Sequence, residues 1–97
     1  MTGKAGRERK LADLAGIGPA MLGDFARLGI RSVAELARQS PEKMYERMAA
    51  LDGRAHDICV LDVFRCAVAQ ARNPRLAPAK RNWWYWSRRR KARDAKK

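Results

Sequence analysis

A glycine-rich turn between two apolar segments, in residues 11–30, most strongly limits how this chain can fold; the segment reads LADLAGIGPAMLGDFARLGI. Its first two leucines lie one helical turn apart, and a second run with helical spacing begins behind Pro19, a residue that suits a first helical position. Gly16 and Gly18 flank Ile17 and permit a turn through positive φ, while Ile17 fills the space between the helices. The segment therefore predicts two helices joined by a tight hairpin.

The start of the second helix is predicted to bind an anion. The first amides of a helix have no intrahelical partner, its dipole is positive there, and glycine leaves the approach open. Because proline follows Gly18, we expect Gly18 to be extended. A DNA phosphate fits this site, with Lys10 as a nearby charge and donors from the amides of Gly16, Ile17, Gly18 and Ala20. The alternative is that the glycines form only a tight turn.

The spacing L-x-x-L-x-G-I-G-P, from Leu11 to Pro19, resembles the helix-hairpin-helix motif. This family mostly binds the DNA backbone without reading its sequence, so the resemblance implies phosphate contacts by the hairpin amides. Two positions depart from the family pattern. Leu22 stands where a small residue is usual, and Ala20 and Met21 stand where a basic residue is frequent.

The net charge of +12 is concentrated at the two ends of this chain of 97 residues. Residues 72–97 carry eleven Lys and Arg against one Asp, residues 1–10 carry four against one Glu, and residues 11–71 carry seven against eight acidic residues. Basic arms suit a polyanion, because each neutralised phosphate releases a counterion. The candidate contacts in the C-terminal arm are Arg88, Arg89, Arg90 and Lys91. The alternative is a solubilising, partly disordered tail.

A second pair of helices is predicted behind the first. Ser32 and Ser40 have the side chain of a helix cap, and Pro41 follows Ser40 at a first helical position. Shifting the chain by 22 residues pairs Pro19 with Pro41 and aligns the apolar positions, but replaces G-I-G by R-Q-S. We therefore expect a degenerate hairpin that packs without exposing amides. The alternative is a chance match between two amphipathic helix pairs.

The segment ICVLDVFRCAVAQA, capped by Asp57, predicts a central helix against which both hairpins pack. Asp62 and Arg65 lie on its thin polar stripe and are expected to form a local pair. Further along, Trp83, Trp84 and Trp86 follow a proline-containing linker. We expect one or two of them to cover the core or to anchor a protein partner; the alternative is a stacking surface for exposed bases.

The order of these segments, from L-x-x-L-x-G-I-G-P-A to W-W-Y-W, is similar to that of small bacterial helix-hairpin-helix proteins named for a pathogenicity locus. The resemblance covers residues 11 to about 87 and implies an all-α, SAM-like bundle of about five helices with one hairpin motif and a degenerate second hairpin. More distantly, the tandem arrangement is similar to the C-terminal domain of the RNA polymerase α subunit, which contacts both DNA and proteins.

Enzymatic, metal and membrane functions are not expected. His56, Cys59 and Cys66 lack a fourth metal ligand nearby, and cysteines on an apolar helix behave as small hydrophobes. Cys59 and Cys66 lie roughly 10 Å apart along one helix and are expected to stay reduced. Without about 18 consecutive apolar residues or an apolar N-terminal stretch, a cytoplasmic protein is predicted. No catalytic residue, cofactor or small-molecule substrate is expected.

The sequence thus predicts three parts: a basic N-terminal arm (1–10), a helical domain (11–72), and a Trp-rich segment with a basic tail (73–97). The predicted function is sequence-nonspecific binding of nucleic acid, with duplex DNA as the expected partner. The alternative is a helical protein-interaction module.

Overall fold

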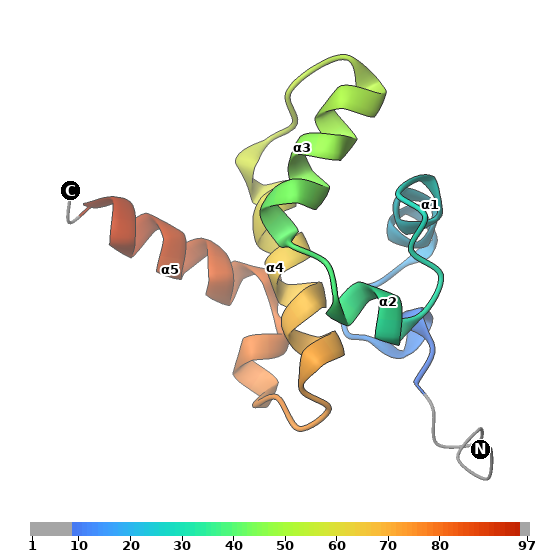
Figure 1. Cartoon of the computed structure of the whole chain (residues 1–97). Coiled ribbons are helices and arrows are strands. Elements are labelled where there is room, and N and C mark those ends of the chain that lie inside the picture. Colours follow the sequence, from blue (N-terminus) through green and yellow to red (C-terminus); the bar gives the residue numbers. More distant parts are fainter. Residues whose placement is uncertain (1–8, 96–97) are drawn as a thin grey trace, which may run out of the picture.

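The computed structural model describes residues 9–95, which form five α-helices and two 3₁₀ turns, with no strand among these residues (Figure 1). In chain order the elements are η2 (Leu11–Asp13), α1 (Pro19–Arg27), α2 (Val33–Ala37), α3 (Pro41–Asp52), α4 (Ile58–Arg72), η3 (Pro78–Arg81) and α5 (Trp83–Ala95). The predicted all-α fold is confirmed. Most of the basic N-terminal arm, residues 1–8, lies outside the described residues, as do residues 96–97.

Helices α2, α3 and α4 begin where their capping residues predicted. The side chains of Ser32, Ser40 and Asp57 each accept a hydrogen bond from a backbone amide two or three residues further on, at 3.0, 3.3 and 2.9 Å. Each bond satisfies one of the donors that a helix start leaves unpaired. None of the described helices has the length and apolar character of a membrane span.

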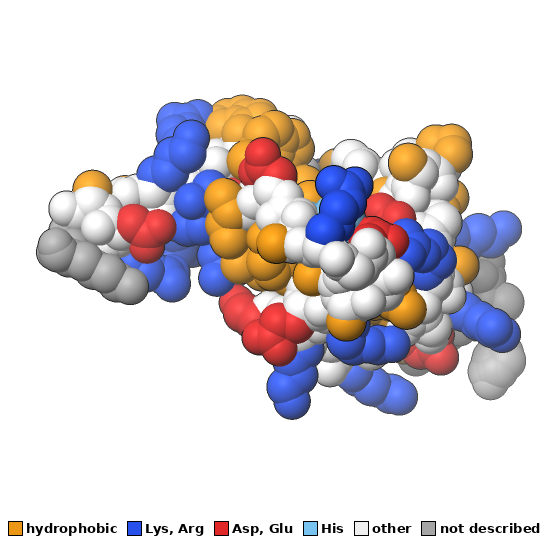
Figure 2. All heavy atoms as spheres, turned by 90° about the horizontal axis from the view of Figure 1, so that it is seen from above, with side chains coloured by type: hydrophobic (Ala, Val, Ile, Leu, Met, Phe, Trp, Pro, Cys, Tyr) orange, Lys and Arg blue, Asp and Glu red, His pale blue; other side chains and the backbone are white. Residues whose placement is uncertain are grey.

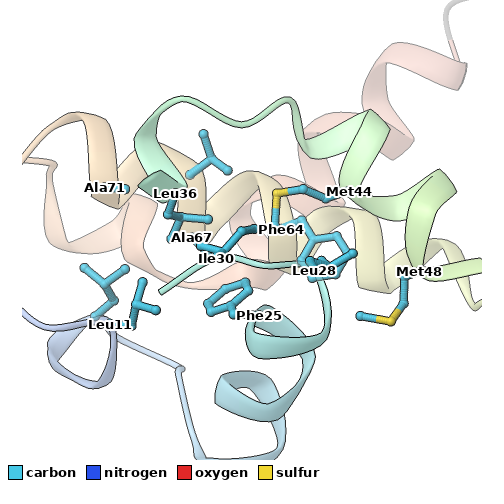
Figure 3. Packing of buried hydrophobic residues seen from close by; sticks show 12 residues of the cluster. Leu11, Phe25, Leu28, Ile30, Leu36, Met44, Met48, Phe64, Ala67 and Ala71 are labelled. Carbon is cyan, nitrogen blue, oxygen red and sulfur yellow. The ribbon is translucent and has the colours of Figure 1, made fainter. Parts of the chain in front are cut away.

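Helix α4 lies at the centre of the molecule. Helices α2, α3 and α5 pack directly on it, and α1 reaches it through Phe25, whose ring centroid lies 6.3 Å from that of Phe64. Figure 3 shows the buried side chains of α1, α2 and α3 converging on α4. The central position predicted for this helix is confirmed. The core consists of Leu11, Leu14, Phe25, Leu28, Ile30, Leu36, Met44, Met48, Phe64, Ala67, Val68 and Ala71.

The helix expected before the hairpin is only one 3₁₀ turn, so this part of the prediction was wrong. The chain becomes extended at Leu14, where ψ is 142°, and only the three residues Leu11–Asp13 are helical. Starting a helix fixes several dihedrals for one hydrogen bond, so a segment this short gains little from continuing. One turn is sufficient for packing, because Leu11 and Leu14 are both buried. The second predicted helix is present as α1.

The basic C-terminal segment is an ordered helix through Ala95. Helix α5 packs on α4 near its start and then projects from the body on the side away from α1 (Figure 1). The alternative of a partly disordered tail is therefore wrong for the described part of this segment. The fifth helix of the bundle comes from the predicted tail, whereas the first predicted helix is reduced to a turn.

Candidate nucleic-acid interface

The hairpin loop has the backbone conformations that its glycines predicted. Gly16 has φ +80°, a value that favours glycine over other residues, and it turns the chain between η2 and α1. Gly18 is the N-cap of α1 and is extended, with φ −103° and ψ −175°, and Pro19 is the first helical residue. A Cβ built on Gly18 meets no atom within 4 Å. The approach to the start of α1 is therefore open.

The amides at the start of α1 are available to a ligand. The first bond of the helix runs from the Leu22 amide to the Gly18 carbonyl (3.0 Å), and the amides of Ala20 and Met21 have no acceptor within residues 9–95. Gly18 has no side chain to cap them, whereas Ser40 caps the corresponding start of α3. The starts of α1 and α3 thus differ, as the exchange of G-I-G for R-Q-S predicted.

One of the four predicted donors has an internal partner. The Ile17 amide donates to the Leu14 carbonyl at 3.3 Å, so it closes the turn before the loop. The Gly16 and Gly18 amides, like that of Ala20, have no acceptor in the described part of the chain. The side chain of Lys10, the predicted nearby charge, is exposed, and its backbone amide donates to Asp13 Oδ2 at 2.7 Å.

A buried glutamine holds the hairpin loop on α4. Gln70 is 4% exposed; its Oε1 accepts from the Ala15 amide (2.9 Å), and its Nε2 donates to the Ala15 carbonyl (3.1 Å). Both hydrogen bonds fix the backbone one residue before Gly16, so α4 orients the loop directly. Gln70 is not among the predicted site residues, although a polar residue near the end of an apolar helix is a visible signal for such a contact.

The tryptophans divide into exposed and half-buried residues. Trp83 and Trp84 are 43% and 44% exposed, while Trp86 is half-buried and its Nε1 donates to the Lys80 carbonyl at 2.9 Å. None belongs to the core cluster. Trp83 also lines an apolar pocket of about 270 Å³ together with Gly16 and Ile17. The structure therefore brings the hairpin loop and the start of α5 to one place.

The four predicted cations of α5 have different surroundings. The guanidinium carbon of Arg88 lies 4.4 Å from the ring centroid of Trp84, and that of Arg89 lies 5.6 Å from the Trp86 ring. Lys91 is exposed. Arg90 instead pairs with Asp62 of α4, and the hydrogen bond to that carboxylate raises the pKa of Arg90. Figure 2 shows basic side chains on the left, where α5 projects.

The ion pair predicted between Asp62 and Arg65 is present, but it is the longer of the two ion pairs that Asp62 forms. Arg65 Nη1 lies 3.9 Å from Asp62 Oδ1, whereas Arg90 Nη2 lies 3.0 Å from Asp62 Oδ2. Asp62 is fully buried, although the sequence placed it on a polar stripe. Its main role is therefore to bind α5, which local spacing did not indicate.

The two cysteines are free, as predicted. Burial raises the pKa of the Cys66 thiol, and a hydrogen bond to Asp57 raises that of Cys59, so both thiols favour the protonated form. The side chain of His56 faces Asp52, with 2.6 Å between Nε2 and Oδ2. Within residues 9–95, no group of three or more His, Cys, Asp or Glu residues is placed to hold a metal ion.

Comparison with known proteins identifies the family. The Cdd1 model, described as pathogenicity locus, matches residues 4–92. The mitomycin resistance protein McrB of Streptomyces lavendulae is 38% identical over 81 residues, which cover 84% of this chain and 73% of that protein. No solved structure gives a significant match. The family match spans the hairpin loop, the central helix and the tryptophan segment, and the chain therefore belongs to the Cdd1 pathogenicity-locus family.

Proposed function

We propose that this protein is a non-enzymatic module that binds the backbone of duplex DNA without reading its sequence. In this proposal, residues 11–30 act as a helix-hairpin-helix element whose first helix is shortened to one 3₁₀ turn. The observation that carries the proposal is the open start of α1, where the amides of Ala20, an exposed residue, and Met21, a half-buried one, have no acceptor within residues 9–95. Such amides, with the positive end of the helix dipole, suit a phosphate oxygen.

The rigidity of the loop supports the same function. Gln70 holds Ala15 through two hydrogen bonds, and Gly16 turns the backbone immediately afterwards. A preorganised loop loses little conformational entropy when the phosphate binds. The contacts are to phosphate alone, so they carry no sequence information, and affinity is expected to be equal for unrelated duplexes.

Helix α5 adds long-range attraction. Arg88 and Lys91 are exposed and lie on one helix that projects from the body. Each contact between such a side chain and a phosphate releases a condensed counterion, which strengthens binding at low salt. The two cysteines are free, which is compatible with a function in the reducing environment of the cytoplasm.

A second candidate function is the docking of a protein partner. Trp83 and Trp84 are large exposed hydrophobic residues, and Trp83 borders the 270 Å³ pocket beside the hairpin loop. Exposed tryptophans next to an apolar pocket are typical of interaction hot spots. In this case the hairpin is scaffold, and its amides stay bound to water.

The two candidates are separated by a salt titration of the full chain against short duplexes and single strands of unrelated sequence. DNA-backbone binding predicts a linear fall of log K with log salt and equal affinity for all duplexes. Tighter binding to single strands, lost on Trp84→Ala, would favour stacking of bases on α5. No binding even at low salt would contradict the proposal and leave protein docking as the function.

A further inference from the structure

A second basic site lies between α4, α5 and the start of α3. It is a groove of about 320 Å³ whose walls include five arginines: Arg65, Arg72, Arg89, Arg90 and Arg93. We call it the arginine groove. Glu42 is the one carboxylate among its lining residues, and Asp62 lies buried behind Arg90. Two carboxylates thus face five guanidinium groups.

Part of this arginine set is fixed by neighbouring backbone and side chains. Arg72 donates from Nε to the carbonyl of Ala37, the last residue of α2 (2.8 Å), and from Nη2 to the carbonyl of Gln39, just beyond it (2.9 Å). Arg65 donates from Nη2 to Glu42 Oε2 at 3.0 Å, but the Glu42 side chain is 54% exposed. A carboxylate that is mostly in water is a weak partner, so an anion entering the groove can compete for Arg65.

The remaining charge of the groove has no counterion among the residues that the structure describes. Arg89 and Arg93 form no ion pair within residues 9–95. Arg89 lies beside the Trp86 ring, which also forms part of the wall. A planar guanidinium presents its donors as a fork that matches a phosphate group, and arginine is therefore over-represented where proteins bind this anion. The groove therefore has the chemistry of a phosphate site.

This groove and the hairpin loop use opposite faces of α4. Val63 and Ala67 line the pocket beside the hairpin loop, whereas Arg65, Ala69 and Arg72 line the groove. At 3.6 residues per turn, these two sets point to opposite sides of the helix. Figure 1 agrees with this separation, since α1 lies on one side of α4 and α5 on the other. One phosphate group cannot occupy both places.

We propose that the arginine groove is a second phosphate-binding site, so that one molecule holds two segments of nucleic-acid backbone and bridges them. The proposal rests on the proposed DNA binding for its first segment, at the hairpin. It differs from a simple basic tail because it assigns Arg65, Arg72, Arg89 and Arg93 to one built site on the far side of the central helix.

The test is a bridging assay with the full chain. One duplex is fixed to beads, and protein-dependent capture of a second, labelled duplex is measured beside the affinity for a single duplex in solution. R89Q/R93Q should lower capture at least about fivefold, because two counterion-releasing contacts are lost, and should leave binding to a single duplex detectable. The matched control is R38Q/R54Q, which removes the same charge from exposed positions outside both sites.

Several outcomes would overturn bridging while leaving hairpin binding intact. In the first, R89Q/R93Q captures the second duplex as well as the wild-type protein does. In the second, R38Q/R54Q loses as much capture as R89Q/R93Q. In the third, the wild-type protein binds one duplex but captures no second one. Bridging by the groove is also contradicted if capture of the second duplex occurs only at protein concentrations where light scattering shows self-association.

Failure of the proposed function is recognised separately, because the wild-type protein then binds no duplex at all. In that case the groove is tested with pyrophosphate, and the fluorescence of Trp86 in a W83F/W84F background is the readout. A saturable change that R89Q/R93Q abolishes would identify a site for free phosphate compounds, which contradicts bridging but retains the phosphate chemistry. No change would overturn the site entirely.

Discussion

Arg90 of α5 binds both carboxylate oxygens of Asp62 on α4, with its Nε 3.1 Å from Oδ1 and its Nη2 3.0 Å from Oδ2. Asp62 is fully buried, so this pair joins the basic C-terminal helix to the interior of the domain. A paired guanidinium satisfies a carboxylate that burial would otherwise penalise heavily. Arg90 is therefore a structural residue, unlike its exposed neighbours Arg88 and Arg89.

Removing Arg90 is expected to release α5. Arg90→Met leaves the carboxylate of Asp62 without its closest cation, and the urea midpoint of unfolding should fall well below that of the wild-type protein. Adding Asp62→Asn should recover part of the loss, since the unpaired charge is then removed. An Arg90→Met protein as stable as Arg88→Met would show that this ion pair does not hold the helix.

The exposed charges of α5 are expected to act through salt-dependent binding alone. Replacing Arg88 and Lys91 by Gln should flatten the slope of log K against log salt by about 2, if both meet duplex phosphates, and should leave the unfolding midpoint nearly unchanged. Truncation before Arg88 is a poorer test because it also removes Arg90. An unchanged slope would mean that this face of α5 does not touch DNA.

Phe64 lies at the centre of the fold and is fully buried. Phe64→Ala should cost about 3 to 5 kcal/mol in free energy of unfolding, because it removes the contact with Phe25 and leaves a cavity. Leu51→Ala, at a side chain that is 54% exposed, is the control and should cost below about 0.5 kcal/mol. Urea denaturation measures both. Similar losses in the two variants would contradict the central role of α4.

Stability is expected to decline in acid. The hydrogen bond from Arg27, followed by that from His56, lowers the pKa of Asp52, and the Cys59 amide lowers that of Asp57. A carboxylate with a lowered folded-state pKa stabilises the protein above the unfolded-state value of about 4, and this contribution disappears as pH falls through the folded-state pKa. The urea concentration at the midpoint of unfolding should therefore decrease when the pH is lowered below about 4.

Neutral substitutions identify the carboxylates responsible for this acid sensitivity. Asp57→Asn keeps a capping oxygen and removes the charge, so it should lower the urea midpoint modestly at neutral pH and reduce the acid-induced fall by a similar amount. Glu46→Gln, at an exposed carboxylate with no ion pair within residues 9–95, is the control. If both variants lose stability in acid as the wild-type protein does, Asp57 contributes nothing to the effect.

Local signals were sufficient to predict α2, α3 and α4, because Ser32, Ser40 and Asp57 each cap the helix that follows them. The helix predicted at Leu11 is longer than the observed 3₁₀ turn, since two leucines one turn apart are equally compatible with either structure. The spacing of apolar residues indicates which side chains are buried, and Leu11 and Leu14 are both buried. The spacing does not determine how many helical turns the segment forms.

Tertiary contacts explain what the sequence could not predict. Helix α5 has little apolar periodicity, and its Arg90 pairs with Asp62, 28 residues earlier in the chain. Gln70 likewise acts on Ala15, 55 residues away. At the hairpin, by contrast, the conformations of Gly16 and Gly18 followed from the residues themselves, because Pro19 favours an extended neighbour and the turn requires positive φ.

The affinity of Gly18→Ala for duplex DNA, compared with that of Gly23→Ala, tests the proposed hairpin contact most directly. Both changes add one methyl group without charge, and neither new Cβ meets an atom within 4 Å. Gly23→Ala lies inside α1, where it should stabilise the helix by about 0.5 to 1 kcal/mol and leave DNA binding unchanged. Ala20→Lys, beside the open amides, should tighten binding, whereas Ala50→Lys on α3 should have a smaller effect.

The decisive result is the ratio of the two glycine variants' affinities. If the amides at the start of α1 hold a phosphate, Gly18→Ala should bind every duplex about fivefold to tenfold more weakly than Gly23→Ala, with a stability loss of no more than about 1 kcal/mol, because its Cβ keeps the backbone away from the anion. Equal affinity of Gly18→Ala and Gly23→Ala for DNA, with both proteins folded, would contradict the hairpin contact and make the loop a scaffold.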